Sequence, residues 1–268
     1  MFSRSSQYPR GTYCWPRCAF ADDPSRRLGA HIDGFPGIVS DTIVVGTPTA
    51  EQSDLIVATH YATEALLRLM LPAEVHPSNT EEKPYKPPTS YAITQTIQKI
   101  ADVYGCRVVE STTSFQIERN EVEGKKKLVL APGENMAKSE GVPEVGDVWG
   151  VEIWLSKGSG KVKEIAGKRA TLFKKTDTKT SLKRESARKT YNEIQKKFGT
   201  FPFGLRQLSD ERTAKTGVIE CQRSNILRQY EVLGDKDGAL VSRIYVTAGR
   251  FRVEMSLIRI PSADPLFA

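Results

Sequence analysis

Two carboxylates and a histidine near the start of the chain are the first residues whose types and spacing could do chemistry. Asp33 and Asp41 lie eight residues apart in a β-rich segment, and His31 precedes them. Carboxylates and imidazoles bind divalent metals in hydrolytic centres, and a β-bulge could turn both carboxylates to one side. The alternative is that Asp33 forms a turn with Gly34 while Asp41 faces solvent. We expect the turn, because Asp-Gly is a common turn pair, and we expect His31 to line a pocket or to be a structural histidine.

Two further motifs carry weaker signals. Cys14-Trp-Pro-Arg-Cys18 has no second cysteine pair, and a zinc site needs four ligands, so we expect no zinc there. Lys157-Gly-Ser-Gly-Lys161 resembles part of a phosphate loop but lacks its full spacing. We predict a tight turn between two strands, with a contact to phosphate as the alternative.

Positive charge is concentrated in one window. Residues 157–197 hold 14 Lys or Arg against four acids, a net charge of +10 in a chain whose total is +7. Such a window favours a polyanion, because each neutralised phosphate releases counterions; the alternative is a solvated lysine-rich face. The sequence shows no helix-turn-helix, RRM or zinc-finger signature, so we expect contacts to nucleic-acid backbone rather than base readout. The residues predicted to make these contacts are Lys183, Arg184, Arg188, Lys189, Lys196, Lys197 and Arg206.

Composition limits the class of protein. The chain has 268 residues, 39% of them hydrophobic and 26% charged, which is typical of a globular domain large enough to fold without disulfides. Four cysteines spread along the chain favour a reducing compartment. No apolar run is long enough to cross a membrane, so we expect no membrane partner.

Hydrophobic periodicity then predicts helices first and strands later. Thr49-Ala-Glu-Gln52 has the form of a capping box before an amphipathic helix that ends by Pro72, and a second helix should end at Gly105. A basic helix is expected over 181–198, and a short helix over 210–216 that leads into 217–221. The predicted strands are 106–110, 127–131, 147–156 and 170–174, a hairpin of 230–233 with 239–247, and a closing strand over 251–258. Within 147–156, Trp149 and Trp154 should point to opposite faces. This order indicates an α+β fold.

Several ordered motifs then resemble a known family: His31-Ile-Asp-Gly-Phe35, Ala65-Leu-Leu-Arg-Leu69, Trp149-Gly-Val-Glu-Ile153 followed by Ser156-Lys-Gly-Ser-Gly-Lys161, Phe201-Pro-Phe-Gly-Leu-Arg206 and Gly217-Val-Ile-Glu-Cys221. Together they resemble the proliferation-associated, or curved-DNA-binding, branch of the type 2 methionine aminopeptidase-like family (peptidase M24).

The resemblance implies the pita-bread (creatinase/aminopeptidase) fold over residues 27–268, with the type 2 helical insert at about 181–235. Residues 1–26 are expected to form a tail that does not match the family and that stands where its N-terminal part would be. The sequence is then either a natural fragment or the product of a gene-model error. We therefore expect open strand edges, uncovered apolar faces and poor solubility.

The resemblance also implies where a metal pair would bind. Active members use two Asp, one His and two Glu, and only Glu152 keeps its identity here. The other four positions correspond to Arg27, Ile38, Phe115 and Tyr245. The chain has no histidine after His76, although the family's ligand histidine follows the second helix. We therefore expect a pseudo-enzyme without a cofactor.

The function that the resemblance and the charge imply is binding of structured RNA or duplex DNA. It would occur near the ribosome or in ribosome biogenesis, in the nucleus, nucleolus and cytoplasm. One alternative is a protein-interaction module whose vacant pocket holds a partner. The other is a metal-dependent methionine aminopeptidase with rearranged ligands.

Overall fold

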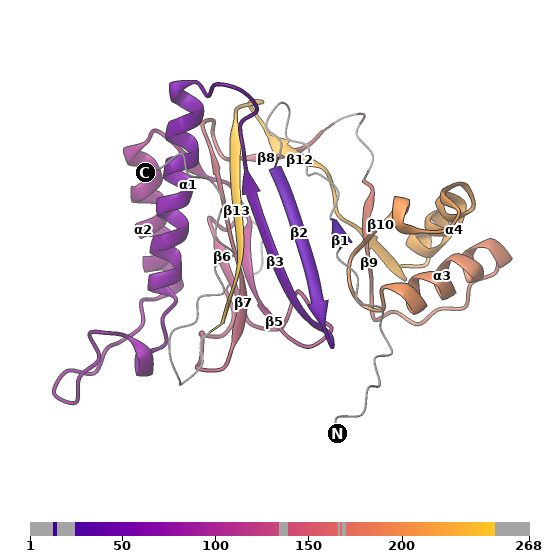
Figure 1. Cartoon of the computed structure of the whole chain (residues 1–268), viewed down its shortest axis with the longest axis horizontal. Coiled ribbons are helices and arrows are strands. Elements are labelled where there is room, and N and C mark those ends of the chain that lie inside the picture. The colour runs from indigo at the N-terminus through magenta and orange to yellow at the C-terminus, as the bar shows by residue number, and fades with distance from the viewer. Residues whose placement is uncertain (1–12, 15–24, 134–138, 166, 168–169, 250–268) are drawn as a thin grey trace.

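The computed structural model describes residues 13–14, 25–133, 139–165, 167 and 170–249. Within them a large lobe and a small lobe lie side by side (Figure 1). The predicted strand 251–258 and most of the Cys14–Cys18 motif lie outside these residues.

An antiparallel sheet of eight strands forms the large lobe. Its order is β1-β2-β3-β13-β7-β5-β6, and β4 also pairs with β7. The strands are β1 (Tyr13–Cys14), β2 (Ser25–Ile32), β3 (Phe35–Thr42), β4 (Arg107–Val108), β5 (Thr112–Ile117), β6 (Lys127–Leu130), β7 (Val148–Ser156) and β13 (Val241–Gly249). Asp33 and Gly34 connect β2 to β3 with positive φ angles of 51° and 88°, which confirms the predicted turn.

Two helices cover one face of this sheet (Figure 1). They are α1 (Ala50–Leu69) and α2 (Ser90–Val103), with a short 3-10 turn, η1 (Ala73–Val75), between them. The capping box at Thr49 is present, because its hydroxyl accepts from the Gln52 amide while the Gln52 side chain accepts from the Thr49 amide. Leu55, Ala58, Ala62 and Leu66 are fully buried in one core with Val151, Ile153 and Leu155 of β7.

The small lobe has its own hydrophobic core. Its elements are β8 (Val162–Glu164), β9 (Leu172–Lys175), α3 (Glu185–Lys197), β10 (Phe203–Gly204), η2 (Leu205–Gln207), α4 (Glu211–Arg223), β11 (Leu227–Gln229) and β12 (Leu233–Asp235). β10 and β11 flank β9, and α3 and α4 pack on each other. Phe173, Ile194, Phe203 and Cys221 lie in this core, which holds the basic helix in place.

Three sequence predictions differ from the structure. The predicted hairpin of 230–233 with 239–247 is wrong, because β12 pairs with β8 whereas β13 lies between β3 and β7. The segment 217–221 continues α4 rather than following it. Gly217 suits that helix because a Cβ there would overlap the Thr190 hydroxyl of α3. The sequence did not predict β1, β5, β8, β10 or β11.

Apolar side chains of the β2–β3 hairpin extend beyond the cover of α1 and α2. Leu28, Ile32 and Phe35 are 52%, 77% and 59% exposed. Strand register sets Leu28 opposite Val39 and Ile32 opposite Phe35, so these residues share the sheet face on which the helices pack. These exposed side chains agree with the expectation of uncovered apolar surface, and open strand edges and poor solubility stay predictions.

Candidate functional site

The residues at the five candidate ligand positions lie on neighbouring strands. They are Arg27 in β2, Ile38 in β3, Tyr245 in β13, Glu152 in β7 and Phe115 in β5. Tyr245 of β13 pairs with Glu152 of β7 on one side and with Ser40 of β3 on the other. Ser40 in turn pairs with Arg27 of β2. Residues paired in an antiparallel ladder point to the same face. Tyr245 and Glu152 therefore point away from α1 and α2, whose core takes the alternate residues of β7.

A cavity of about 440 Å³ lies on this face, between the sheet and the small lobe. Ile38, Phe115, Glu152 and Tyr245 all line it, so the structure brings together the four positions whose side chains it describes. We call it the Glu152 cavity. Its charged lining residues are Glu110, Glu123, Glu152, Glu231, Arg228 and Arg243.

Arg243 neutralises the Glu152 carboxylate. Its guanidinium forms an ion pair with Glu152 Oε1, and the Arg243 side chain is only 4% exposed. The same carboxylate oxygen accepts a hydrogen bond of 2.8 Å from the Trp154 indole N–H. The guanidinium carbon also lies 4.6 Å from the centroid of the Trp154 ring. The one acid at a candidate ligand position is therefore held by a cation and a donor of the protein itself.

Backbone contacts fix Arg243 in this position. Its amide donates to the Thr42 hydroxyl at 2.8 Å, and that hydroxyl donates to the Arg243 carbonyl at 3.1 Å. These bonds continue the β3–β13 contact beyond the two residue pairs of its regular ladder. Trp149, in contrast to Trp154, is buried in the core under the helices, so the prediction that the two rings face opposite ways is confirmed.

Tyr245 and Ile38 belong to an apolar cluster with Val122 and Phe201. The Tyr245 hydroxyl lies so close to Gly150 that a Cβ there would overlap it. Glycine at position 150 therefore makes room for the tyrosine. His31 stacks on Phe201 of this cluster with ring centroids 4.9 Å apart, which is a structural role.

Polar contacts join the small lobe to the cavity wall. Glu123, in the β5–β6 connection, accepts a hydrogen bond of 2.8 Å from the Tyr230 hydroxyl and forms an ion pair with Arg228. Lys174 of β9, whose side chain is 8% exposed, forms an ion pair with Glu121 and lies 3.4 Å from Glu123. Lys174 is buried, and its charge is stable there only when paired, so these contacts hold the lobes together beside the cavity.

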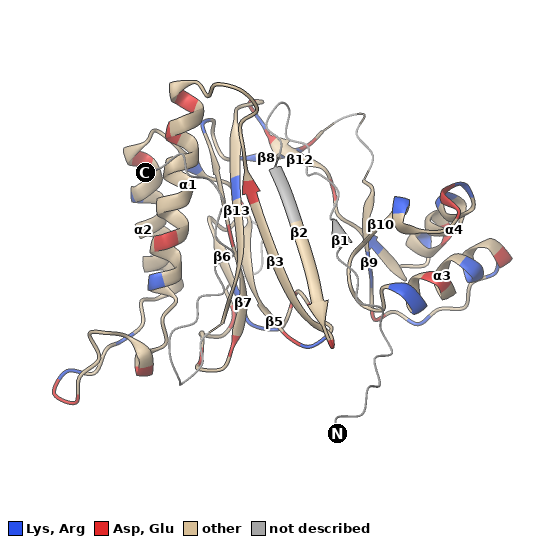
Figure 2. Ribbon diagram, viewed as in Figure 1, with Lys and Arg blue, Asp and Glu red and all other residues tan. Residues whose placement is uncertain are grey.

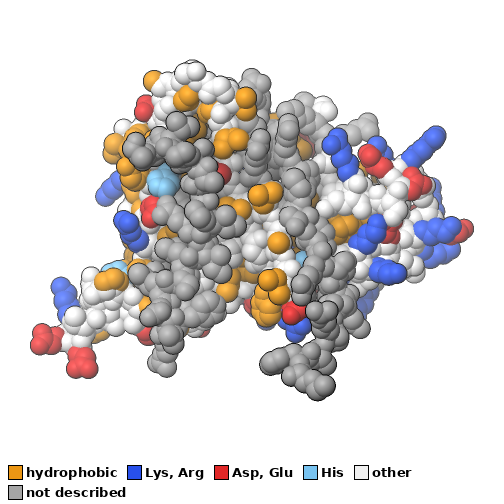
Figure 3. Space-filling model, viewed as in Figure 1, with side chains coloured by type: hydrophobic (Ala, Val, Ile, Leu, Met, Phe, Trp, Pro, Cys, Tyr) orange, Lys and Arg blue, Asp and Glu red, His pale blue; other side chains and the backbone are white. Residues whose placement is uncertain are grey.

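The predicted nucleic-acid contacts cluster on the small lobe. Lys183 and Arg184 directly precede α3, Arg188, Lys189, Lys196 and Lys197 lie on it, and Arg206 lies in η2. Blue Lys and Arg positions mark this end of the ribbon in Figure 2, and cationic side chains project from the same end in Figure 3. We call these seven residues the basic surface.

Some of these charges are paired within the lobe. Lys189 binds Glu185 at 2.8 Å, and its hydrogen bond holds the pKa of Glu185 below the usual value. Lys197 binds Glu193 at 2.6 Å. Arg184 lies 3.6 Å from Glu220, whose other oxygen accepts from the Lys183 and Arg184 amides and so caps α3. Lys183, Lys196 and Arg206 are exposed and have the greatest freedom to meet an external anion.

The 157–161 loop is a turn whose amides are already occupied. The Gly160 amide donates to Asp235 at 3.1 Å and the Ser159 amide to Asp237 at 3.1 Å. Lys157 donates to the Tyr104 carbonyl at 2.8 Å. Carboxylates at these amides leave no cradle for a phosphate, so the turn interpretation is confirmed.

Known proteins resemble this chain in sequence and fold. The curved DNA-binding protein of Schizosaccharomyces pombe is 39% identical over 227 residues, which are 82% of this chain and 55% of the relative. A solved structure of a thermophilic Arx1 is 52% identical with a TM-score of 0.80, covering 85% of this chain and 63% of that one. A methionine aminopeptidase from Rickettsia prowazekii shares the fold, with a TM-score of 0.50 at 14% identity. The chain belongs to the methionine aminopeptidase-like family. Its branch is that of the curved DNA-binding and proliferation-associated proteins.

The fold is therefore the pita-bread fold of that family, as the motifs implied. The chain spans about half the length of the curated relatives it matches. No protein-family model matches it. None of the helices in the described part of the chain is long and apolar enough to cross a bilayer.

The residues of the Glu152 cavity do not fit the two divalent metals of active family members. Such metals need several oxygen or nitrogen ligands that converge on them. Among the described residues, no three His, Cys, Asp or Glu side chains are grouped to hold a metal ion. The positive charge beside Glu152 is supplied by Arg243, while Ile38, Phe115 and Tyr245 have no metal-binding carboxylate or imidazole.

Sequence reasoning missed Arg243 and the Glu123–Arg228–Tyr230 contacts. A signal for Arg243 existed, because it stands two residues before Tyr245 and so shares a strand face with it. The contacts of Glu123 join residues more than 100 positions apart, and nothing in the sequence pattern pairs them.

Proposed function

We propose that this chain is a non-catalytic member of its family that binds structured RNA or duplex DNA through the basic surface. One observation carries the proposal: the exposed cations of α3 and its flanks gather on a lobe with its own core, away from the helices of the large lobe (Figure 2). Lys and Arg neutralise phosphates along a duplex and release its counterions. The partner we propose is therefore a polyanion recognised by its backbone and shape.

The ion pair of Arg243 with Glu152 supports the non-catalytic part of the proposal. A metal at Glu152 would compete with the buried guanidinium of Arg243 for the same carboxylate. The name of the S. pombe relative, curved DNA-binding protein, supports the nucleic-acid part. We extend the proposal to association with the ribosome or its precursors, in the nucleus, nucleolus and cytoplasm.

The test is affinity for an RNA duplex and a DNA duplex, measured by fluorescence anisotropy across a salt series. Lys183→Glu, Lys196→Glu and Arg206→Glu together should weaken binding at least tenfold. They should also flatten the slope of log affinity against log salt by about 0.9 for each phosphate that is no longer neutralised. These three side chains are exposed, so the fold should be unaffected.

A matched control has the same change of charge on the large lobe. Lys83→Glu, Lys86→Glu and Lys99→Glu alter exposed residues of the α1–α2 connection and α2. This control should bind as the unaltered chain does. Equal affinity of both triple variants would refute the basic surface as the binding site.

A second candidate function rests on the Glu152 cavity. Its described lining has four Glu and two Arg, and its apolar floor includes Phe115 and Leu172, which suits a peptide end that carries an ammonium group. Pull-down with and without nuclease separates the two functions, since a peptide partner survives nuclease. Methionine release after addition of Mn²⁺ or Co²⁺, abolished by Glu152→Ala, would instead support an active aminopeptidase.

A further inference from the structure

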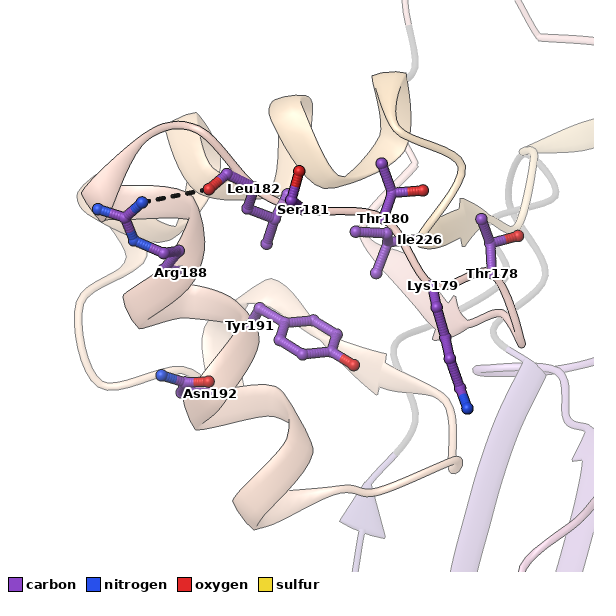
Figure 4. Close-up of a pocket in the computed structure, with 9 residues that line it drawn as sticks. All are labelled: Thr178, Lys179, Thr180, Ser181, Leu182, Arg188, Tyr191, Asn192 and Ile226. Carbon is purple, nitrogen blue, oxygen red and sulfur yellow. Dashed lines mark hydrogen bonds between the residues drawn. The ribbon is translucent and has the colours of Figure 1, made fainter.

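A second cavity, of about 470 Å³, lies within the small lobe (Figure 4). The loop 178–182 forms one side and Arg188, Tyr191 and Asn192 of α3 form the other, with Ile226 between them. We call it the Tyr191 cavity. Its volume is in the range of about 300–1,000 Å³ that holds small organic ligands.

The charge of this cavity differs from that of the Glu152 cavity. Lys179 and Arg188 supply two positive charges, and none of the described residues that line it is Asp or Glu. Thr178, Thr180 and Ser181 add hydroxyl donors. Ammonium, guanidinium and hydroxyl groups each suit the oxygens of a phosphate.

Tyr191 provides an aromatic surface beside these donors. Its side chain is half-buried against the core of the small lobe, and its ring extends from α3 toward the loop (Figure 4). The Lys175 ammonium lies 5.7 Å from the ring centroid and donates to the Gln195 side chain at 2.6 Å. A ring held in this way can stack on a planar base.

Arg188 is fixed in a defined orientation. Its Nη1 donates to the carbonyls of Leu182 and Lys183 at 3.3 and 3.2 Å. A guanidinium carries five N–H donors, so Nε and Nη2 still offer donors to an anion. The cavity thus holds its arginine in place before any ligand binds.

We infer that the Tyr191 cavity takes one unpaired nucleotide of a bound RNA, with its base against Tyr191 and phosphates of the flanking strand against Arg188 on one side of the ring and Lys179 on the other (Figure 4). A base inside a duplex is stacked and cannot reach a ring in a concave site, whereas an unpaired base can. An isolated phosphate would use the cations but not the ring. The inference rests on the proposed function and extends it, because the basic surface alone explains only contact with a duplex backbone.

The test compares two RNA ligands with the same stem, one blunt and one with a single-stranded overhang of several nucleotides. The unaltered chain should bind the overhang RNA more tightly. Tyr191→Leu should remove that preference, a loss of about 5- to 100-fold corresponding to one stacked base. It should not change affinity for the blunt stem. Tyr191→Phe keeps the ring and should keep the preference, and Tyr61→Leu on α1 is the matched control.

Each result then has a definite meaning. Equal affinity for the two ligands, or a preference that survives Tyr191→Leu, overturns the inference while the proposed function stands. Absence of binding to both RNA ligands and to a DNA duplex overturns the proposed function as well. A DNA stem with the same overhang shows whether the cavity takes any unpaired nucleotide or requires ribose.

A measurement on the unaltered chain covers the case in which Tyr191→Leu does not fold. An overhang that carries 5-iodouridine is irradiated in the complex, and the cross-linked peptide is identified by mass spectrometry. The cross-link should fall within residues 178–192. Cross-links found only outside that segment would overturn the inference.

Discussion

Replacing Arg243 by methionine should destabilise the protein strongly, because it leaves Glu152 buried without its cation. The Arg243 side chain is 4% exposed and that of Glu152 is 16% exposed. Removal of one partner from a buried ion pair costs about 3–5 kcal/mol. Glu152 borders a cavity that can admit water, so we expect the lower end, about 3 kcal/mol.

The effect of breaking the pair can be separated from the effect on packing. Arg243→Met also removes the guanidinium from the Trp154 ring, a contact worth about 0.5–2 kcal/mol. The double variant Arg243→Met with Glu152→Gln leaves no buried carboxylate without a cation. The side-chain amide oxygen at position 152 can still accept a hydrogen bond from the Trp154 indole. The double variant should lie within about 1 kcal/mol of the unaltered chain, because isosteric replacement of a buried pair is often neutral. The effects of the two single variants should not add, and their coupling should be about 2 kcal/mol or more.

Urea unfolding followed by far-UV circular dichroism gives these free energies. In thermal unfolding, a destabilisation of about 3 kcal/mol corresponds to a fall in Tm of about 6–12 °C for a chain of this size. Lys189→Met, which breaks the exposed pair with Glu185, is the control and should change little. A cost below about 1 kcal/mol for Arg243→Met, or a double variant no more stable than the single ones, would refute the argument that Arg243 is the required counter-charge.

Three further predictions concern the cavity and the cores. Millimolar Mn²⁺ or Co²⁺ should leave Tm unchanged in differential scanning fluorimetry, because a ligand stabilises a fold only where it binds; a rise in Tm that Glu152→Ala removes would contradict this. Gly150→Ala should cost about 1–3 kcal/mol in urea unfolding because its methyl overlaps the Tyr245 hydroxyl, and the cost should fall in a Tyr245→Leu background. Burial raises the pKa of Cys221 to about 11, so iodoacetamide should not label it in the native chain at pH 8, and labelling should accelerate only as the pH approaches that value. Prompt labelling at pH 8, read by mass spectrometry, would show that the core of the small lobe is open.

The local signals in the sequence were sufficient for α1, α2 and α3, whereas α4 is longer than they predicted. The capping box at Thr49 and the apolar spacing after it specify α1 within one stretch of chain, and the structure has both. The expected stripe on the basic helix was Ala187, Tyr191, Ile194 and Phe198. Ala187 and Ile194 of α3 and Phe198 at its C-cap are buried, and Tyr191 is partly buried against the same core. Such elements depend on residues three and four apart, which a single sequence displays directly.

Strand partners could not be predicted in the same way. The Gly-Asp-Lys-Asp-Gly segment favours a local hairpin, yet Asp235 of β12 pairs with Val162 of β8 and also binds the Ser156 hydroxyl at 2.7 Å. These residues lie more than 70 positions apart in the chain, and β13 pairs with β7 along its whole length instead. Long-range pairing therefore overrides the turn signal, and period alone does not reveal it.

The candidate site divides along the same line. Ordered motifs located Ile38, Phe115, Glu152 and Tyr245, and the structure brings all four to one cavity because the family fold keeps its register. The motifs could not predict that Arg243 pairs with Glu152, because this ion pair joins residues of two different strands. Residue identities at the candidate ligand positions can be read from the sequence. The side chain that neutralises Glu152 can be identified only from the fold, which brings Arg243 beside it.

The two cavities have opposite charge and belong to different cores. The described lining of the Glu152 cavity carries four acids and two Arg, while that of the Tyr191 cavity carries Lys179 and Arg188 without an acid. We therefore expect the small lobe to attract a polyanion and the cavity beside the central sheet to repel it. Because the cores under the two lobes are separate clusters, changes of charge on α3 need not disturb Glu152 and Arg243. The Glu152–Arg243 pair and the basic surface are thus physically independent features of the fold.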